Sequence, residues 1–259
     1  MSNYQNWVYT RNPFVRVAKY SFERLYAIVV DHESKLAQRS NDPQLSALYQ
    51  RFLSISTTFK AAYVAWQSAL DFQVVKTAQL DTLLSSLLKR ELFIWDAQIQ
   101  VDVPIFSEEY RALMRGGRSF YHNAKKDIRI SGVRRLAENL KEYPNLASLQ
   151  ADVEAFAVSL ENLRDEQKRR VEITRTALQT LRELRDDACT MLFRNLAMLL
   201  DLYPNNPQRV TNFFLMELVR SSSNTSLEEE TETEYVEEEP TSEMGEEPME
   251  VNPSEEDGN

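Results

Sequence analysis

The sequence predicts an all-α protein, an elongated antiparallel helical bundle with two long helices. Two segments of roughly 60 residues contain neither Gly nor Pro, and each repeats apolar residues with the 3-4 spacing of an amphipathic helix. No stretch alternates apolar and polar residues for long enough to predict a strand. An apolar content of 42%, with 12 Phe, 11 Tyr and 3 Trp, supports a folded body.

The expected helices can be placed in order along the chain. The first is expected at 14–40, where one side carries Val15, Ala18, Phe22, Leu25, Val29 and Leu36. The others are expected at 44–101, 107–115, 131–142, 145–202 and 207–219. Asp42-Pro43 and Asn206-Pro207 each have the form of an N-cap followed by the first helical residue, which supports the starts of two of these helices.

The two long segments have polar middles, at 67–79 and 164–177. Each segment therefore forms either one helix of about 58 residues, roughly 85 Å long, or a hairpin broken near its middle. We favour the unbroken helix because neither middle contains Gly or Pro. The two long helices would then lie antiparallel, with the shorter helices covering their ends.

A weak repeat of about 101 residues links the two halves. Pro43 and Pro144 are 101 residues apart, and Pro104 and Pro204 are 100 apart. The apolar residues recur in the same phase, with Leu45, Leu48 and Phe52 in the first half and Leu146, Leu149 and Val153 in the second. This pattern predicts an internal duplication, and the alternative is a coincidence between two amphipathic helices.

The charge divides the chain into a body and a tail. The formal net charge is −10, yet residues 228–259 hold 15 acidic residues and no Lys or Arg, so residues 1–227 carry +5. The tail cannot bury enough apolar surface to fold, which predicts disorder. The expected organisation is an aromatic arm at 1–13, helical repeats at 14–118 and 119–220 packed as one bundle, and a disordered acidic tail at 221–259.

Several classes of protein are disfavoured by what the sequence lacks. A single cysteine excludes an intramolecular disulfide framework, and no apolar run is long enough for a membrane span or a signal peptide, so we expect a cytoplasmic protein without membrane contact. No glycine-rich phosphate loop occurs. Neither His32 nor His122 belongs to a metal-binding motif, and we expect His32 at the surface or at its boundary and Cys189 in the core. We therefore expect no enzyme activity, catalytic residue, metal or cofactor.

The most distinctive local feature is the basic segment 111–135. It contains one acidic residue and eight basic ones, which are Arg111, Arg115, Arg118, Lys125, Lys126, Arg129, Arg134 and Arg135. Phe120 and Tyr121 lie among these charges. The segment is either a solvated linker or a site for nucleic acid or another polyanion, in which cations neutralise phosphates and aromatic rings stack on bases, with the acidic tail as a competitor.

Long amphipathic helices, an acidic tail and the lack of a catalytic constellation favour a non-enzymatic scaffold or interaction protein. Its partner is expected to be another protein that the sequence does not identify. Self-association is a second expectation, because a long helix can extend its apolar stripe onto another copy. Binding of nucleic acid or polyanion is the alternative and is not favoured.

Overall fold

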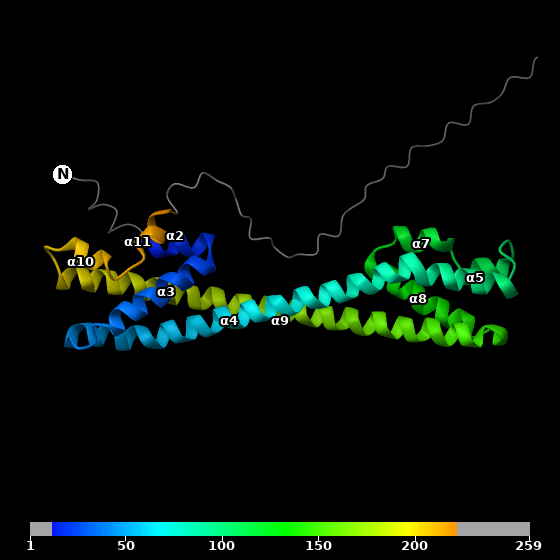
Figure 1. Cartoon of the computed structure of the whole chain (residues 1–259), viewed down its shortest axis with the longest axis horizontal. Coiled ribbons are helices and arrows are strands. Elements are labelled where there is room, and N and C mark those ends of the chain that lie inside the picture. The colour runs from blue at the N-terminus through cyan, green and yellow to red at the C-terminus, as the bar shows by residue number, and fades with distance from the viewer. Residues whose placement is uncertain (1–11, 222–259) are drawn as a thin grey trace, which may run out of the picture. The chain divides into compact units, whose positions relative to one another are not determined.

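The computed structural model describes residues 12–221 as helices joined by short turns, with no strand in that range (Figure 1). The predicted all-α class is confirmed. The chain divides into two units, Met1–Glu228 and Glu229–Asn259, and all described residues belong to the first. The predicted aromatic arm, except residues 12 and 13, and the predicted acidic tail, except residue 221, lie outside the described residues.

The predicted single helix at 14–40 is wrong, because the chain forms two helices there. Helix α2 spans Pro13–Tyr20 and α3 spans Phe22–Ala37. Between them Ser21 is extended, with φ −162° and ψ 118°, and its hydroxyl accepts a hydrogen bond from the Arg24 N–H at 3.2 Å. Serine favours this N-cap geometry, and the cap starts a new helix instead of continuing the old one.

The two long helices are unbroken, as predicted. The first runs for 60 residues through α4 (Pro43–Ser86), a single π-helical turn η1 (Leu87–Glu91) and α5 (Leu92–Asp102). The second runs for 59 residues through the 3₁₀ turn η2 (Pro144–Leu146) and α9 (Ala147–Leu202). The polar middles remain helical because nothing in them interrupts the i→i−4 hydrogen bonds.

The short helices differ in part from their predicted ranges. They are α6 (Glu108–Leu113), α7 (Gly117–Asn123), α8 (Lys126–Leu140), α10 (Pro207–Thr211) and α11 (Met216–Ser221). The basic segment 111–135 is thus helical over most of its length, whereas helices were predicted there only within 107–115 and 131–142. The predicted helix at 207–219 is also wrong as one element, since turns separate α10 from α11.

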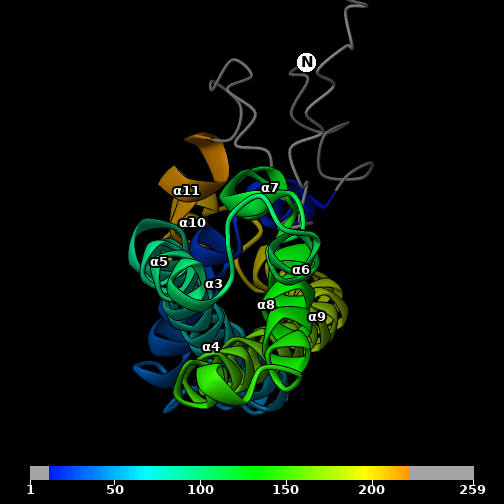
Figure 2. The ribbon, with the colours of Figure 1, turned by 90° about the vertical axis from the view of Figure 1, so that its right-hand side faces the viewer.

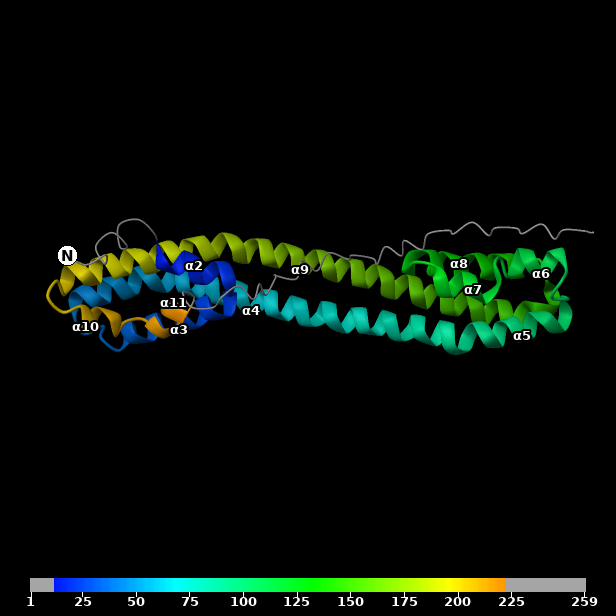
Figure 3. The same ribbon diagram turned by 90° about the horizontal axis from the view of Figure 1, so that it is seen from above.

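The long helices lie antiparallel, and shorter helices cover their two ends (Figures 1 and 3). One buried cluster joins α2, α3, α10 and the turn before α11 to the start of α4 and the end of α9. The other joins α5, α6, α7 and α8 to the end of α4 and the start of α9. Seen end-on, α8 and α9 lie next to each other and α4 continues into α5 (Figure 2).

The middle of the bundle is thinner than its ends. Coverage by α3 stops where the Phe22 ring meets Trp66, with ring centroids 5.6 Å apart. Coverage by α8 begins where Lys126 pairs with Asp81 at 2.8 Å. Among the described helices, only α4 and α9 occupy the stretch between these points (Figure 3). We call this stretch, residues 67–76 of α4 and 168–177 of α9, the waist.

Buried positions recur between the long helices. At an offset of 101 the buried pairs are Leu45/Leu146, Leu48/Leu149, Phe52/Val153, Ser56/Ala157, Phe59/Leu160, Leu80/Leu181 and Leu87/Ala188. After the π-helical turn the offset becomes 100, in Leu92/Leu192, Trp95/Asn195 and Ile99/Leu199. A π turn holds one extra residue in a helix, which accounts for the two proline offsets. The duplication itself stays a prediction, and its proposed boundary at 118/119 falls inside α7.

Candidate interaction surfaces

A second 3-4 stripe runs along the solvent side of α4. It consists of Ala61, Val64, Ser68, Phe72, Val75, Gln79, Thr82 and Ser86, which we call the outer stripe. At about 100° per residue these positions share one face of the helix, turned away from the buried positions Ala69 and Leu80. The stripe contains no charged residue over about 38 Å of helix.

The outer stripe carries large apolar side chains in contact with solvent. Val64, Phe72 and Val75 are 57%, 52% and 49% exposed. One face of the Phe72 ring is covered by the Arg170 guanidinium of α9, 5.2 Å from the ring centroid. Solvent-facing helix positions are usually charged or polar, so exposed apolar residues at regular spacing indicate a contact surface.

The matching face of α9 provides a comparison within the same chain. Shifting the stripe by 101 residues gives the exposed positions Asn162, Asp165, Arg169, Ile173, Thr176, Thr180, Glu183 and Asp187. Four of these eight residues are charged, as is normal for a solvated helix. The lack of charge on α4 is therefore a property of its sequence and not a requirement of the fold.

A shallow groove of about 650 Å³ lies along the C-terminal half of the stripe. Its walls are Val75, Ala78, Gln79, Thr82, Leu83 and Ser86 of α4, with Leu163 of α9. The side chains that line this groove are uncharged, and the exposed Val64 and Phe72 lie on the N-terminal half of the stripe. This surface was not predicted from the sequence, although the uncharged 3-4 spacing was a signal for it.

The eight basic residues of segment 111–135 are distributed over α6, α7, α8 and their connecting turns. Three of them form ion pairs within the fold: Arg118 with Asp96 at 3.3 Å, Lys126 with Asp81 at 2.8 Å, and Arg134 with Glu161 at 2.9 Å and also with Glu154. These pairs fasten α7 to α5, α8 to α4 and α8 to α9. Part of the positive charge is thus compensated locally.

The other basic residues differ in their surroundings. Arg129 donates a hydrogen bond to the His122 carbonyl at 2.9 Å, and the Arg135 guanidinium lies 5.5 Å from the centroid of the Phe120 ring. The side chains of Arg111, Arg115 and Lys125 are exposed. An anion at this segment would therefore meet these exposed side chains.

The aromatic residues of the basic segment pack inside the protein. Tyr121 is buried, its hydroxyl donates to the Gly132 carbonyl at 3.2 Å, and burial raises its pKa to about 12. A Cβ on Gly132 would lie 2.9 Å from the Phe120 ring, so glycine permits this close approach of α7 to α8. The suggestion that Tyr121 stacks on bases is therefore wrong, because its ring belongs to the core.

The expectation that His32 lies at or near the surface is also wrong. Its ring is fully buried and stacks on Phe214, with centroids 4.4 Å apart. Nδ1 donates to the Phe213 carbonyl at 2.9 Å, so the neutral Nε2 accepts from the Asn195 amide at 3.0 Å. Burial lowers the pKa of His32 to about 4, which keeps the ring neutral. The sequence did contain a signal for this burial, because residues 25, 29, 32 and 36 share one face of the helix and the other three are apolar.

Two further polar clusters hold helices together. Asp96 of α5 accepts from the Tyr110 hydroxyl and from the Gln100 amide, the latter at 2.8 Å. Arg164 of α9 is buried and binds Asp127 of α8 through two hydrogen bonds of 2.9 Å, which hold the pKa of Asp127 below its ordinary value. Such satisfied polar groups fix the pairing of helices and leave no vacant base or nucleophile among them.

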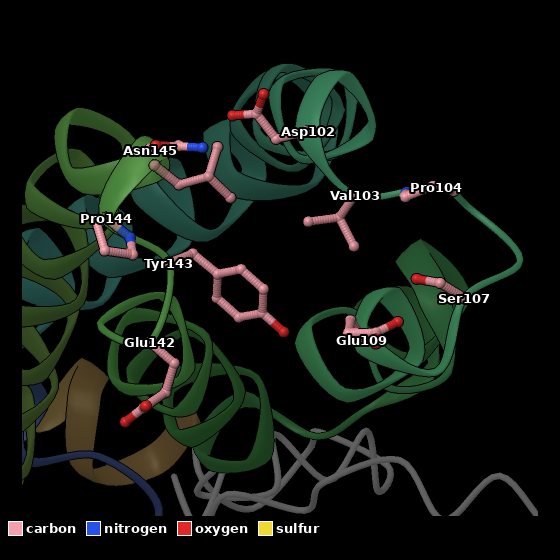
Figure 4. Close-up of a pocket in the computed structure, with 10 residues that line it drawn as sticks. Asp102, Val103, Pro104, Ser107, Glu109, Glu142, Tyr143, Pro144 and Asn145 are labelled. Atoms are coloured by element: carbon pink, nitrogen blue, oxygen red, sulfur yellow. The ribbon is translucent and has the colours of Figure 1, made fainter.

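A pocket of about 440 Å³ opens where the end of α5 meets the α8–η2 turn (Figure 4). Its wall includes the carboxylates of Asp102, Glu109 and Glu142, and the Tyr143 ring lies between them with its hydroxyl toward Glu109. The remaining lining residues are Val103, Pro104, Ser107, Pro144, Asn145 and Leu146. The lining therefore offers acidic and hydroxyl groups but no His, Cys or Lys for nucleophilic or acid–base catalysis.

Cys189 lies in the core as predicted, and burial raises the pKa of its thiol to about 12. Within residues 12–221 no three His, Cys, Asp or Glu side chains converge as a metal site would require. No helix in the same range has an apolar stretch long enough to cross a bilayer. Comparison with protein-family profiles, curated proteins and solved structures finds no significant match to this chain.

Proposed function

We propose that this protein is a non-enzymatic scaffold or interaction protein whose contact surface is the outer stripe of α4. The observation that carries the proposal is the exposed, uncharged stripe from Ala61 to Ser86, set against the charged face at the equivalent positions of α9. An uncharged strip with three large apolar residues loses water favourably when a second apolar surface covers it.

The chemistry of the buried residues is in keeping with this role. His32 uses both ring nitrogens inside the core, and Cys189 is buried with an unreactive thiol. The polar clusters around Asp96 and Arg164 connect helices to one another. Each of these groups has a structural task, so none of them offers a functional site of its own.

Site-specific photocrosslinking in cells tests the proposal with the full chain. A photoreactive amino acid replaces Ser68 in the outer stripe or, as a matched control, Arg169 at the equivalent exposed position of α9. We expect a discrete protein adduct from position 68 and none from position 169. Absence of adducts from positions 64, 68 and 75, or the same adducts from position 169, contradicts the proposal.

A further inference from the structure

The outer stripe has features that favour one particular occupant, a second copy of the same chain. Resting on the function proposed above, we propose that two copies pack antiparallel through their outer stripes about a two-fold axis near Val75. A two-fold interface places the same surface of both copies in contact, so that surface must complement itself in shape and in charge.

The spacing of the stripe meets the requirement for shape. Counted from Val75, Ser68 and Thr82 lie seven residues away on either side, and Val64 and Ser86 lie eleven residues away. Reversing the helix about Val75 therefore places Val64 opposite Ser86 and Ser68 opposite Thr82. Phe72 comes opposite Ala78, and Gln79 comes opposite Asp71. The two ends differ in bulk, since large side chains at 64 and 72 on one copy come to face small side chains on the other.

The groove supplies the space for those large side chains. An axis at Val75 brings Phe72 of each copy opposite Ala78 of the other, which lines the groove between α4 and α9. The groove volume of about 650 Å³ is several times that of a phenyl ring, so the neighbouring side chains of the partner copy can enter it as well. This arrangement repeats the knob-into-hole packing of antiparallel helices.

The requirement for charge is met because the stripe is uncharged. Direct contact of identical faces would bring like charges together on the face of α9, where Asp165, Arg169, Glu183 and Asp187 are exposed. On α4 the nearest flanking carboxylate, Asp71, comes opposite Gln79 of the partner copy instead of another carboxylate.

The length of the stripe is adequate for a dimer. Residues 61–86 span nearly four heptads, and three to four heptads are the usual minimum for a coiled coil. At the waist the dimer would place four helices together, two from each copy, where each copy alone has two. The exposed Val64, Phe72 and Val75 would then be covered by the partner copy.

Sedimentation velocity of the full chain between about 5 and 100 µM tests the inference. We expect a dimer for the wild type, and a dissociation constant raised on the order of 100-fold for Val64→Glu/Val75→Glu, because carboxylates would be buried without partners. Val74→Glu is the matched control, since Val74 is 55% exposed on α4 but lies outside the stripe. Circular dichroism establishes that both variants remain helical.

Single-cysteine crosslinking tests the position of the axis. A residue at a two-fold axis meets its own copy, so Val75→Cys is expected to form a disulfide-linked dimer in air while Val74→Cys remains unlinked. The natural Cys189 is buried and does not interfere. A wild type that stays monomeric at 100 µM, or a dimer unaffected by Val64→Glu/Val75→Glu, overturns the inference. If the photocrosslinked adduct formed at position 68 then contains a protein other than this chain, the proposed interaction function stands although the dimer does not.

Discussion

At the scale of single residues, the polar groups of the core join helices that are distant in the sequence. His32 of α3 is bonded both to the turn after α10 and to Asn195 of α9, so one imidazole connects three parts of one end of the bundle. A buried donor or acceptor that lacks a hydrogen-bond partner destabilises the folded state by about 1–3 kcal/mol. The two hydrogen bonds of the ring therefore favour this arrangement of the elements over arrangements in which the ring would meet only apolar groups.

Burial of neutral His32 makes the stability of the protein depend on pH. The folded-state pKa of about 4 lies below the ordinary 6.5, so the unfolded chain binds a proton more readily between these values. The stabilisation is fully present above pH 6.5 and is lost as the pH falls toward 4. We expect the free energy of unfolding to decrease by about 2 kcal/mol between pH 7.5 and 5, measured by urea denaturation.

Two glutamine substitutions separate His32 from other sources of pH dependence. His32→Gln retains an amide that donates and accepts but does not titrate, so the decrease between pH 7.5 and 5 is expected to shrink markedly. His122→Gln removes an exposed imidazole and is expected to behave like the wild type. Equal pH dependence in both variants and in the wild type would show that His32 does not control it.

At the scale of elements, the π-helical turn adjusts the first long helix to its partner. Leu87 and Leu92 are both buried although they are five residues apart, a separation that a regular α-helix would turn to different faces. Their counterparts in α9, Ala188 and Leu192, are four residues apart and share a face in a regular helix. The π turn therefore absorbs one residue without disturbing the core on either side.

Removing one residue from this turn tests that interpretation. Deletion of the exposed Arg90 brings Leu87 and Leu92 to a separation of four, so a regular helix can bury both and we expect stability within about 1 kcal/mol of the wild type. Deletion of the exposed Gln79 rotates Leu80 and Leu84 out of the core and is expected to destabilise by more than about 3 kcal/mol. Thermal and urea denaturation of both variants compare the two, and similar losses would refute the one-residue account.

At the scale of the whole molecule, the charge separates along the sequence. The net charge of −10 combines +5 over residues 1–227 with 15 acidic residues in the final 32. Among the residues that the structure describes, ion pairs such as Lys126–Asp81 and Arg164–Asp127 compensate much of the basic charge, while Arg111 and Arg115 remain exposed. The acidic residues of the tail thus determine the sign of the total charge.

Deleting residues 228–259 tests the nucleic-acid alternative. The charge changes from −10 to +5, so we expect the truncated chain to bind a single-stranded oligonucleotide more tightly at about 50 mM salt, with an affinity that falls as salt rises. Fluorescence anisotropy measures both effects. Arg111→Ala/Arg115→Ala in the truncated chain should weaken the binding without breaking the ion pairs of Arg118, Lys126 and Arg134.

A full-length chain with the tail glutamates changed to glutamine is the control for that experiment. It keeps the tail length and removes most of its charge, so it should bind like the truncated chain if electrostatics is the cause. No salt-dependent binding by either chain would eliminate the polyanion hypothesis.

Much of the architecture was predictable from local sequence. The 3-4 spacing and the absence of Gly and Pro predicted both long helices without a break, and Asp42 and Asn206 cap helices as expected, accepting hydrogen bonds from Gln44 and Arg209 N–H groups. The break at Ser21 was not predicted, because a serine within an apolar stripe is compatible with either a continuous helix or an N-cap. Packing of α2 and α3 against other elements decided between the two.

The sequence by itself determined the helical class, the two long helices, the burial of Cys189 and the separation of charge, because each depends on composition or on periodicity along one helix. Only the tertiary structure decided that His32 is buried, that Arg118, Lys126 and Arg134 are paired, and that the outer stripe of α4 is uncovered. These properties depend on which helix lies against which face, and residues far apart in the chain determine that. A periodic pattern shows which side of a helix is apolar. Only the helices packed against it show which side stays exposed and can contact a partner.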